Sequence, residues 1–189
     1  MKTFYHIIIA GGSGSRFWPQ SRKDKPKQLL KILNNKTMIR LTFERINKFA
    51  ESKHIMIVAS KELCQKIQNE IPELPKENFI IEPSGKNTAP AIGMAAIHAL
   101  NKNENSLMAI YPSDHLIDGD DEFQNTIHEA EKLIEKKSCL ITIGIKPTYP
   151  ATGYGYIQFD SNKKMDVKGV YKVKTFAEKP EKETAEKFN

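Results

Sequence analysis

Short apolar runs rich in β-branched residues alternate with helix-like patterns from the N-terminus to residue 145. Apolar runs without alternation are typical of strands buried on both faces of a sheet. The predicted strands are residues 5–10 (YHIIIA), 54–59 (HIMIVA), 78–82 (NFIIE), 107–111 (LMAIY) and 139–145 (CLITIGI). Between them, apolar residues spaced along one helix face predict helices around residues 39–50, 61–71, 88–100 and 123–134.

This alternation predicts an α/β, Rossmann-like fold with a mainly parallel central sheet and helices on both faces. After residue 145 the rhythm changes, because residues 154–159 (YGYIQF) and 171–179 (YKVKTFAEK) are predicted strands separated by a turn-rich segment. We therefore expect an added mixed or antiparallel portion there. The chain is expected to form one domain, 1–189. Since it ends in EKETAEKFN, at the start of a helix, we expect that domain to be incomplete at its C-terminus.

Composition is that of an ordinary globular protein. Of the 189 residues, 39% are hydrophobic and 28% are charged. The sequence contains neither the run of about 18 apolar residues that a membrane helix needs nor a signal-peptide pattern, so we expect a cytoplasmic protein without a membrane partner. The net charge of +6 suits a polyanionic ligand, but scattered lysines and only four arginines argue against nucleic-acid binding. Homo-oligomerisation is left open.

The thiols and imidazoles show no metal-binding pattern. Cys64 and Cys139 lie far apart in the sequence and form no C-x-x-C motif. We expect both to be small buried apolar side chains in a reducing compartment. The histidines show no metal-ligand spacing either and are interpreted as structural: His6, His54, His98, His115 and His128.

The stretch AGGSGSRFWPQSRKDKPKQ (10–28) directly follows the first predicted strand. Open α/β sheets bind ligands at the carboxyl ends of their strands, and glycines let the backbone approach a phosphate closely. The dinucleotide fingerprint is disfavoured because its third glycine position, counted from Gly12, holds Phe17. The Walker loop is disfavoured because no Gly-Lys-Ser/Thr follows. Arg16 and Lys27 could clamp a triphosphate, and the alternative is a flexible loop with incidental basic residues.

The whole 10–28 pattern resembles the signature of sugar nucleotidyltransferases. FWPQSR and PKQ make it most similar to the bacterial mannose-1-phosphate guanylyltransferases. Further blocks agree in order: IEPSGKNTAPAI (81–92), YPSDH (111–115), TGYGYI (152–157) and FAEKP (176–180). The resemblance implies a nucleotidyltransferase domain over 1–189 that transfers GMP from GTP to mannose 1-phosphate, giving GDP-mannose and pyrophosphate, with Mg²⁺ as cofactor.

For the phosphates, the resemblance implies catalytic roles for Arg16, Lys27 and Asp114. Arg16 would hold the β- and γ-phosphates, and Lys27 would contact the phosphates at the reacting centre. The alternative for Lys27 is an exposed lysine after a proline. Asp114 would be a ligand of Mg²⁺, a hard cation that takes few carboxylates and keeps several waters. The backbone that would wrap the nucleotide is Gly11, Gly12, Ser13, Gly14 and Ser15.

Three residues near position 82 are candidates for binding the nucleoside. Thymidylyl relatives have a glutamine that pairs with the base at the position of Glu82. A carboxylate has only acceptors, and guanine presents N1–H and N2–H₂ side by side, so Glu82 could accept from both. The alternative is that Glu82 caps the following helix or faces solvent. Asn87 and Thr88 have the same two interpretations, as helix caps or as groups near the base and ribose.

The residues that would bind the sugar phosphate are assigned from the family resemblance alone. Gly153, Tyr154, Glu178 and Lys179 would bind mannose 1-phosphate, with Glu178 accepting from sugar hydroxyls and Lys179 meeting the phosphate. By spacing alone, these residues are a Gly-Tyr turn before a strand and an exposed ion pair at a strand end. Acidic residues at 118, 120 and 121 are interpreted as a solvated loop and a helix N-terminus.

Two other functions stay open. Family members continue beyond position 189, where a second metal-binding aspartate and part of the sugar pocket lie. The chain could therefore be a nucleotide-binding or regulatory module without turnover. It could also be a relative that uses another sugar 1-phosphate.

Overall fold

A computed structural model of the chain describes residues 2–12, 14, 17–22, 24–164, 167 and 169–187, with only the backbone described for residues 161–164. Ser13, Ser15 and Arg16 of the predicted phosphate loop lie outside these described residues. The chain divides into two compact units, Met1–Thr126 and Ile127–Asn189.

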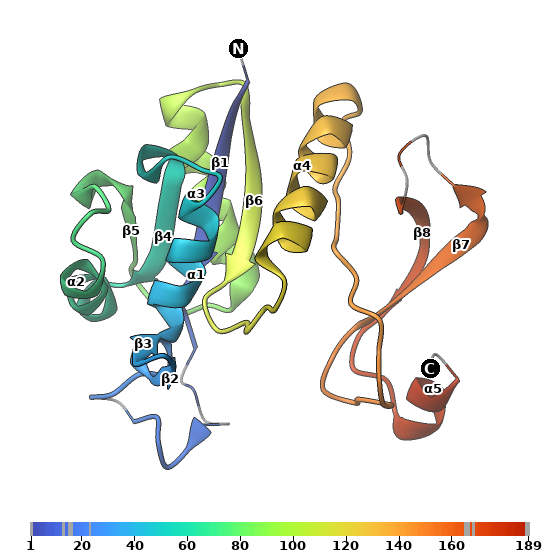
Figure 1. Ribbon diagram of the computed structural model, residues 1–189, viewed down its shortest axis with the longest axis horizontal. Coiled ribbons are helices and arrows are strands. Elements are labelled where there is room, and N and C mark those ends of the chain that lie inside the picture. The colour runs from blue at the N-terminus through green and yellow to red at the C-terminus, as the bar shows by residue number, and fades with distance from the viewer. Residues whose placement is uncertain are drawn as a thin grey trace. The chain divides into compact units, whose positions relative to one another are not determined.

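The first unit is built on a four-stranded parallel sheet with the strand order β5-β4-β1-β6 (Figure 1). Its strands are β1 (Thr3–Ile9), β4 (Ile55–Ser60), β5 (Phe79–Glu82) and β6 (Ser106–Pro112). The chain runs outward from β1 through β4 to β5, and then returns to the other side of β1 to form β6. The connections therefore change direction between β1 and β6. In open α/β sheets such a switch point is where ligands bind.

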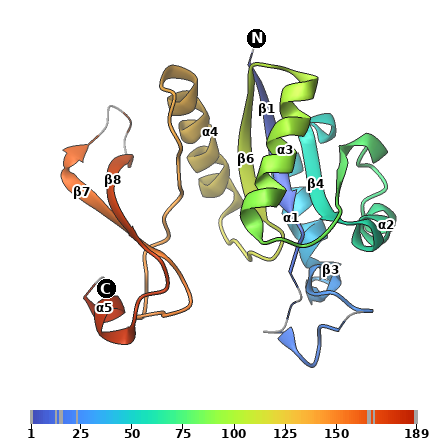
Figure 2. The ribbon, with the colours of Figure 1, turned by 180° about the vertical axis from the view of Figure 1, so that it is seen from behind.

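Helices cover both faces of this sheet, which confirms the predicted fold class. Helix α1 (Met38–Asn47) lies on one face, and α3 (Thr88–Lys102) lies on the opposite face (Figures 1 and 2). Helix α2 (Lys61–Glu70) packs against β4 and β5, and α4 (Asp120–Lys136) follows β6. The side chain of Thr37 caps α1 by accepting from the Arg40 N–H, and the side chain of Ser60 caps α2 by accepting from the Leu63 N–H.

Two sets of side chains fill the first unit. The cluster on the α3 side is Tyr5, Ile7, Met56, Val58, Ile80, Ala91, Ala95 and Ala99. The buried residues that helix α3 contributes are alanines spaced four residues apart on one face, and its Met94 packs against the cluster while partly buried. On its own buried face, α1 contributes Ile39, Phe43 and Ile46. Burying a side chain such as Phe43 stabilises the fold by about 1.5–3 kcal/mol.

His6 lies in the interior, as expected for a structural histidine. Its Nδ1 is 2.9 Å from the Tyr111 hydroxyl, and the two form a buried hydrogen bond. The ring of Phe49 meets the His6 ring edge-on at a centroid distance of 5.5 Å. This buried contact joins β1 to β6, the two strands on either side of the switch point.

Several short elements were not predicted. Strands β2 (Lys31–Leu33) and β3 (Lys36–Thr37) form an antiparallel hairpin. Its turn residues Asn34 and Asn35 both have positive φ, 50° and 58°, which asparagine tolerates. Short 3₁₀ helices also lie in the described part of this unit, among them η2 (Lys27–Leu29), η3 (Ser52–His54) and η4 (Lys76–Asn78).

The second unit contains the predicted antiparallel portion. Strands β7 (Tyr156–Lys164) and β8 (Tyr171–Ala177) pair antiparallel, and the short helix α5 (Lys182–Glu186) follows. The rings of Phe159 and Tyr171 pack against each other across the hairpin, tilted by 34° at a centroid distance of 4.6 Å. Because the pairing register shifts twice along the hairpin, it is an irregular ladder.

The strand predicted at 139–145 is wrong, because the structure assigns no regular element to these residues. Leu140 is fully exposed and Ile145 nearly so. Strand propensity measures how well a side chain fits a pleated, half-buried surface, so an apolar β-branched run does not form a strand without a paired neighbour. For the same reason Cys139 is exposed, contrary to expectation, whereas Cys64 is buried as expected. Among the described residues, no helix is both long and apolar enough to cross a bilayer.

Candidate functional site

The carboxyl ends of β1 and β6 bring the glycine loop and the YPSDH loop side by side. Ile9 of β1 is in register with Pro112 of β6. The Ser113 N–H donates to the Ile9 carbonyl at 3.2 Å, and the Thr42 hydroxyl of α1 donates to the Ser113 carbonyl at 3.3 Å. Ser113 is buried. The backbone that leads into Asp114 is therefore anchored to both the sheet and α1.

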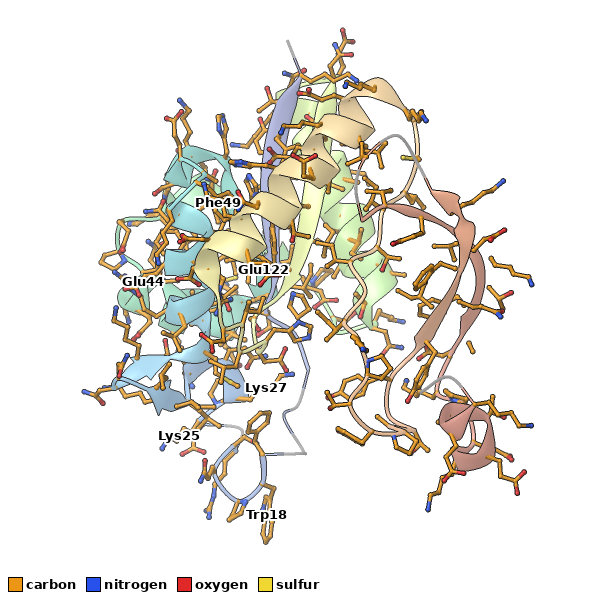
Figure 3. All side chains as sticks on the ribbon, turned by 45° about the vertical axis from the view of Figure 1, so that its right-hand side comes forward. Trp18, Lys25, Lys27, Glu44, Phe49 and Glu122 are labelled. Carbon is orange, nitrogen blue, oxygen red and sulfur yellow. The ribbon has the colours of Figure 1, made fainter. Side chains whose placement is uncertain are left out.

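Lys27 and Asp114 form an ion pair at this edge of the sheet. The Lys27 Nζ donates to Asp114 Oδ2 at 2.5 Å, and the two side chains are only 14% and 23% exposed. Lys27 is labelled in Figure 3, where it lies at the end of the first unit that carries the glycine loop. The structure thus brings together two of the three predicted catalytic residues. The third, Arg16, lies outside the described residues.

The glycine loop folds closely against Lys27. A Cβ added to Gly12 would lie 3.8 Å from Lys27 Nζ. A Cβ added to Gly14 would lie 3.0 Å from Lys27 Cβ and 3.1 Å from Ser21 Oγ. Both glycines have positive φ, 91° and 69°. Gly12 and Gly14 are therefore required by backbone conformation, and Gly14 also by space. Gly11 has no atom within 4 Å of an added Cβ.

Gln28 is a site residue that the sequence reasoning missed. Its side chain is completely buried, and its Nε2 donates to the Gly11 carbonyl at 2.7 Å. The signal for Gln28 in the sequence is its place directly after Lys27 in the PKQ block. The sequence does not indicate that this polar side chain is buried and supports the loop through a hydrogen bond.

The Gly14 carbonyl of the loop accepts hydrogen bonds from neighbouring residues of the chain. The Gly14 carbonyl accepts from the Ser21 hydroxyl and, at 2.9 Å, from the Phe17 N–H. In the described part of the chain, the N–H groups of Gly12 and Gly14 have no acceptor. Backbone N–H groups in such a loop are available to an anion.

Glu82 ends β5 at the same edge of the sheet. Its Oε1 accepts from the Lys86 N–H at 3.4 Å, so the carboxylate helps to order the loop before α3. This contact gives one carboxylate oxygen a structural role in the loop, and it is not a cap of α3, because Lys86 precedes the N-cap residue Asn87. Among the described residues, Oε2 has no hydrogen-bond partner and can accept from a ligand.

Asn87 occupies the N-cap position of α3, but its side chain makes no capping hydrogen bond. Its φ of 68° and ψ of −169° lie in a region that non-glycine residues rarely occupy. Backbone strain of this kind gathers at ligand sites, which favours the ligand interpretation of this residue. Thr88 is the first residue of α3 and is exposed.

Asp114 is the residue here that could hold a metal ion. Among the described residues, no group of three or more His, Cys, Asp or Glu side chains could hold one. Mg²⁺ is commonly bound by one or two carboxylates together with waters and substrate phosphates. A single carboxylate beside a phosphate loop therefore fits Mg²⁺ that is bound jointly with a nucleotide.

The neighbouring acidic residues have structural roles, as interpreted from the sequence. Asp118 Oδ1 accepts from the Gly119 N–H within its own loop. Asp120 begins α4 and pairs with Lys48 at 2.5 Å and with Arg45 at 3.3 Å. The hydrogen bond from Lys48 lowers the pKa of Asp120.

The four predicted sugar-phosphate residues belong to the second unit. Glu178 and Lys179 pair with each other at 3.1 Å, and both side chains are exposed. Tyr154 is also exposed. The glycine that the structure requires is Gly155, since a Cβ there would lie 2.4 Å from Phe176 Cζ and 3.0 Å from Glu178 Oε2. Gly153, the glycine singled out from the sequence, has no atom within 4 Å of an added Cβ.

Comparison with known proteins supports the family resemblance. The model of the family described as Nucleotidyl transferase matches residues 5–189. The chain is 43% identical to a mannose-1-phosphate guanylyltransferase of Escherichia coli over 192 residues, which cover 96% of this chain and 40% of that protein. It is 36% identical to the alginate biosynthesis protein AlgA of Pseudomonas putida, covering 96% of this chain and 37% of that protein. The chain thus spans about 40% of the length of the curated relatives it matches.

Solved structures share the fold. A mannose-1-phosphate geranyltransferase from Thermus thermophilus matches with a TM-score of 0.81 at 26% identity, covering 98% of this chain and 52% of that one. A mannose-6-phosphate isomerase from Helicobacter pylori matches with a TM-score of 0.76 at 29% identity, covering 98% of this chain and 64% of that one. Both matches agree with the α/β fold class predicted from the alternating pattern.

Proposed function

Because the chain belongs to the nucleotidyl transferase family, we propose that it transfers GMP from GTP to mannose 1-phosphate, with GDP-mannose and pyrophosphate as products. One observation carries the proposal: Lys27, Asp114 and the glycine loop meet at the switch point of a parallel sheet. The choice of base and sugar rests on the relatives that are mannose-1-phosphate guanylyltransferases.

In this reaction an oxygen of the sugar phosphate forms the new bond to the α-phosphorus of GTP. The bond from that phosphorus to the oxygen bridging the β-phosphate breaks in line, and pyrophosphate leaves with the electron pair. A phosphate monoester has a second pKa near ~6, so it is largely ionised at neutral pH and needs no general base. What remains for the protein is to align two polyanions and to neutralise their charge.

The phosphates are assigned to the first unit. The N–H groups of residues 11–15 wrap the triphosphate, Arg16 holds the β- and γ-phosphates, and Lys27 meets the phosphates at the reacting centre. The Lys27 ammonium lies against Gly12, which supports this assignment. Asp114 is proposed to hold Mg²⁺, which when bound neutralises charge on the phosphates and helps to align them.

Guanine is assigned to the loop between β5 and α3. The oxygen Oε2 of Glu82 accepts from the guanine donor pair, while Oε1 keeps the loop ordered through Lys86. Asn87 and Thr88 lie near the base and ribose. The strained backbone of Asn87 supports a ligand role in this loop.

Mannose 1-phosphate is assigned to residues of the second unit. Gly153 and Tyr154 form the turn that contacts the sugar, Glu178 accepts from its hydroxyls, and Lys179 meets its phosphate. The Glu178–Lys179 pair supports this assignment because it presents an acceptor and a cation next to each other.

The proposal is tested by measuring pyrophosphate release from each of the four nucleoside triphosphates with mannose 1-phosphate and Mg²⁺. GTP should give the fastest release, and Lys27→Met should lower the rate about 10²-fold or more, as expected when a group that stabilises transition-state charge is removed. Lys25→Met is the matched control, because Lys25 is an exposed lysine two positions earlier. Equal rates for the two variants would contradict the role of Lys27.

The same assay separates the alternatives. GTP binding without pyrophosphate release would indicate a nucleotide-binding module, and release with glucose 1-phosphate alone would change the sugar. Glu82→Gln should erode the preference for GTP over ATP, since an amide replaces one acceptor by a donor. If this variant leaves both affinities unchanged, the base assignment is wrong.

A further inference from the structure

We propose that the Lys27–Asp114 ion pair is a gate that makes the chain bind triphosphate and divalent metal cooperatively and disfavours metal-free triphosphate. The gate is the contact between the Lys27 Nζ and Asp114 Oδ2. This inference rests on the proposed function, in which Lys27 receives phosphate and Asp114 receives the metal.

The contact is held by the fold on both sides. Lys27 begins the 3₁₀ helix η2, where its carbonyl accepts from the Leu30 N–H at 3.0 Å. Asp114 follows Ser113, whose backbone is tied to β1 and α1. Both side chains are mostly shielded from water. A shielded, charge-assisted hydrogen bond is stronger than an exposed ion pair, so opening it has a cost that a ligand must meet.

Each member of the pair is the group that one ligand needs. A phosphate oxygen competes with the Asp114 carboxylate for the Lys27 ammonium, and the carboxylate repels the anion. A divalent cation competes with the ammonium for the carboxylate, and the ammonium repels the cation. Whichever ligand separates the pair also frees the other partner. The second ligand then binds at a lower cost, and the coupling between the two is reciprocal.

The gate predicts an unusual sign for one substitution. Asp114→Asn removes the proposed metal ligand, yet it should strengthen the binding of triphosphate in the absence of metal because Lys27 is released. Removing any carboxylate near the site would also favour an anion through its charge. Asp118→Asn is the matched control, since it removes a carboxylate of the same loop that accepts from the Gly119 N–H.

The experiment measures the binding of inorganic tripolyphosphate in EDTA by titration calorimetry. The proteins are the wild-type chain, Asp114→Asn, Asp118→Asn, Lys27→Met and the double variant Lys27→Met/Asp114→Asn. Circular dichroism checks that each is folded. Trp18, the single tryptophan, lies next to Phe17, whose N–H bonds the Gly14 carbonyl, so its fluorescence reports binding at the loop.

Asp114→Asn should tighten tripolyphosphate binding about fivefold or more, the lower end of typical coupling between two sites. Asp118→Asn should change it less than about twofold, and the tightening should vanish in the Lys27→Met background. Equal tightening by the two aspartate variants would overturn the gate. Tightening that persists without Lys27, or no tightening at all, would do the same.

The probe carries neither base nor sugar, so the result is independent of the GTP and mannose 1-phosphate assignments. Failure of the pyrophosphate assay would leave the gate standing. If tripolyphosphate binds none of the five proteins, the gate is overturned.

Discussion

The two compact units use similar apolar sequence in different ways. In the first unit, β1 and β4 are apolar runs whose central residues, such as Ile7 and Ile57, are fully buried between two helical layers. In the second unit, Leu140 and Ile145 lie in a run of similar apolar composition, residues 139–145, and are exposed. The hydrophobic pattern of the sequence therefore indicates which residues can be buried. Whether they are buried depends on the layers that cover the strand.

The same contrast separates the two sets of candidate site residues. Lys27 and Asp114 are shielded and held by anchored backbone, whereas Glu178 and Lys179 form an exposed pair at the end of a two-stranded hairpin. Hairpins of this kind are marginally stable by themselves. We expect substitutions in the first unit to have large effects and matched substitutions in the second to have small ones.

The largest effect is expected from Phe43→Ala. The Phe43 ring is buried between α1 and the sheet, so its removal should lower the free energy of unfolding by about 3–5 kcal/mol. Phe176→Ala, on the exposed strand β8, should change it by less than about 0.5 kcal/mol. Urea denaturation followed by circular dichroism measures both. If the two variants lose similar free energies of unfolding, the proposed difference in packing between the two units is wrong.

A smaller effect is expected from Gly14→Ala. Its φ of 69° and the close Lys27 Cβ should make an alanine cost about 1–3 kcal/mol of stability. Gly11→Ala is the control in the same loop, with open space at its Cβ, and should cost less than about 0.5 kcal/mol. The comparison uses thermal unfolding midpoints. A loop that accepts both alanines equally well would contradict the conformation described here.

The corresponding pair in the second unit is Gly155→Ala and Gly153→Ala. An alanine at 155 must displace the Phe176 ring, whose far edge would lie 2.4 Å away, but this ring is exposed and can swing outward. The cost should therefore be about 1 kcal/mol, and Gly153→Ala should be neutral. Adding Phe176→Ala to Gly155→Ala should restore stability. If the double variant is no more stable than Gly155→Ala, the clash is not the cause.

The smallest effect is expected from acid. The hydrogen bond from Lys48 depresses the pKa of Asp120 in the folded chain, so the ionised carboxylate favours folding. This contribution is fully present above the unfolded-state pKa of about 3.9 and is lost as the pH falls below that value through the depressed folded pKa. Asp120→Asn should therefore flatten the decline in the unfolding midpoint below about pH 4, relative to the wild type. Parallel curves for the two proteins would exclude this contribution.

Much of the fold follows from periodicity. The predicted strands around residues 5–10, 54–59, 78–82 and 107–111 are present, because their apolar runs coincide with a sheet that is covered on both faces. The run at 139–145 has the same composition and forms no strand, since propensity says nothing about the neighbour with which a strand must pair. The hairpin at β2–β3 was missed, although Asn34 and Asn35 are residues that favour its turn.

The candidate site was predictable where chemistry is carried by the residue type. Lys27 and Asp114 meet because the carboxyl ends of parallel strands share one edge, but the ion pair between them is a matter of geometry. Gln28 and Gly155 were missed because their roles come from tertiary packing, one as a buried support and the other as a close approach. The role of Arg16 stays a prediction.

The small buried side chains of α3 affect the position of the segment that precedes the helix. Ala91, Ala95 and Ala99 are the buried residues of α3 in the cluster on this face of the sheet, and their small side chains allow the helix to lie close to it. Ala91 stands one turn after Asn87, at the start of the helix. A bulkier residue at position 91 would lift the beginning of α3 and move the segment from Glu82 to Thr88 with it. If Glu82 binds the base as proposed, the size of the side chain at position 91 would then affect nucleotide preference from the buried side of the helix.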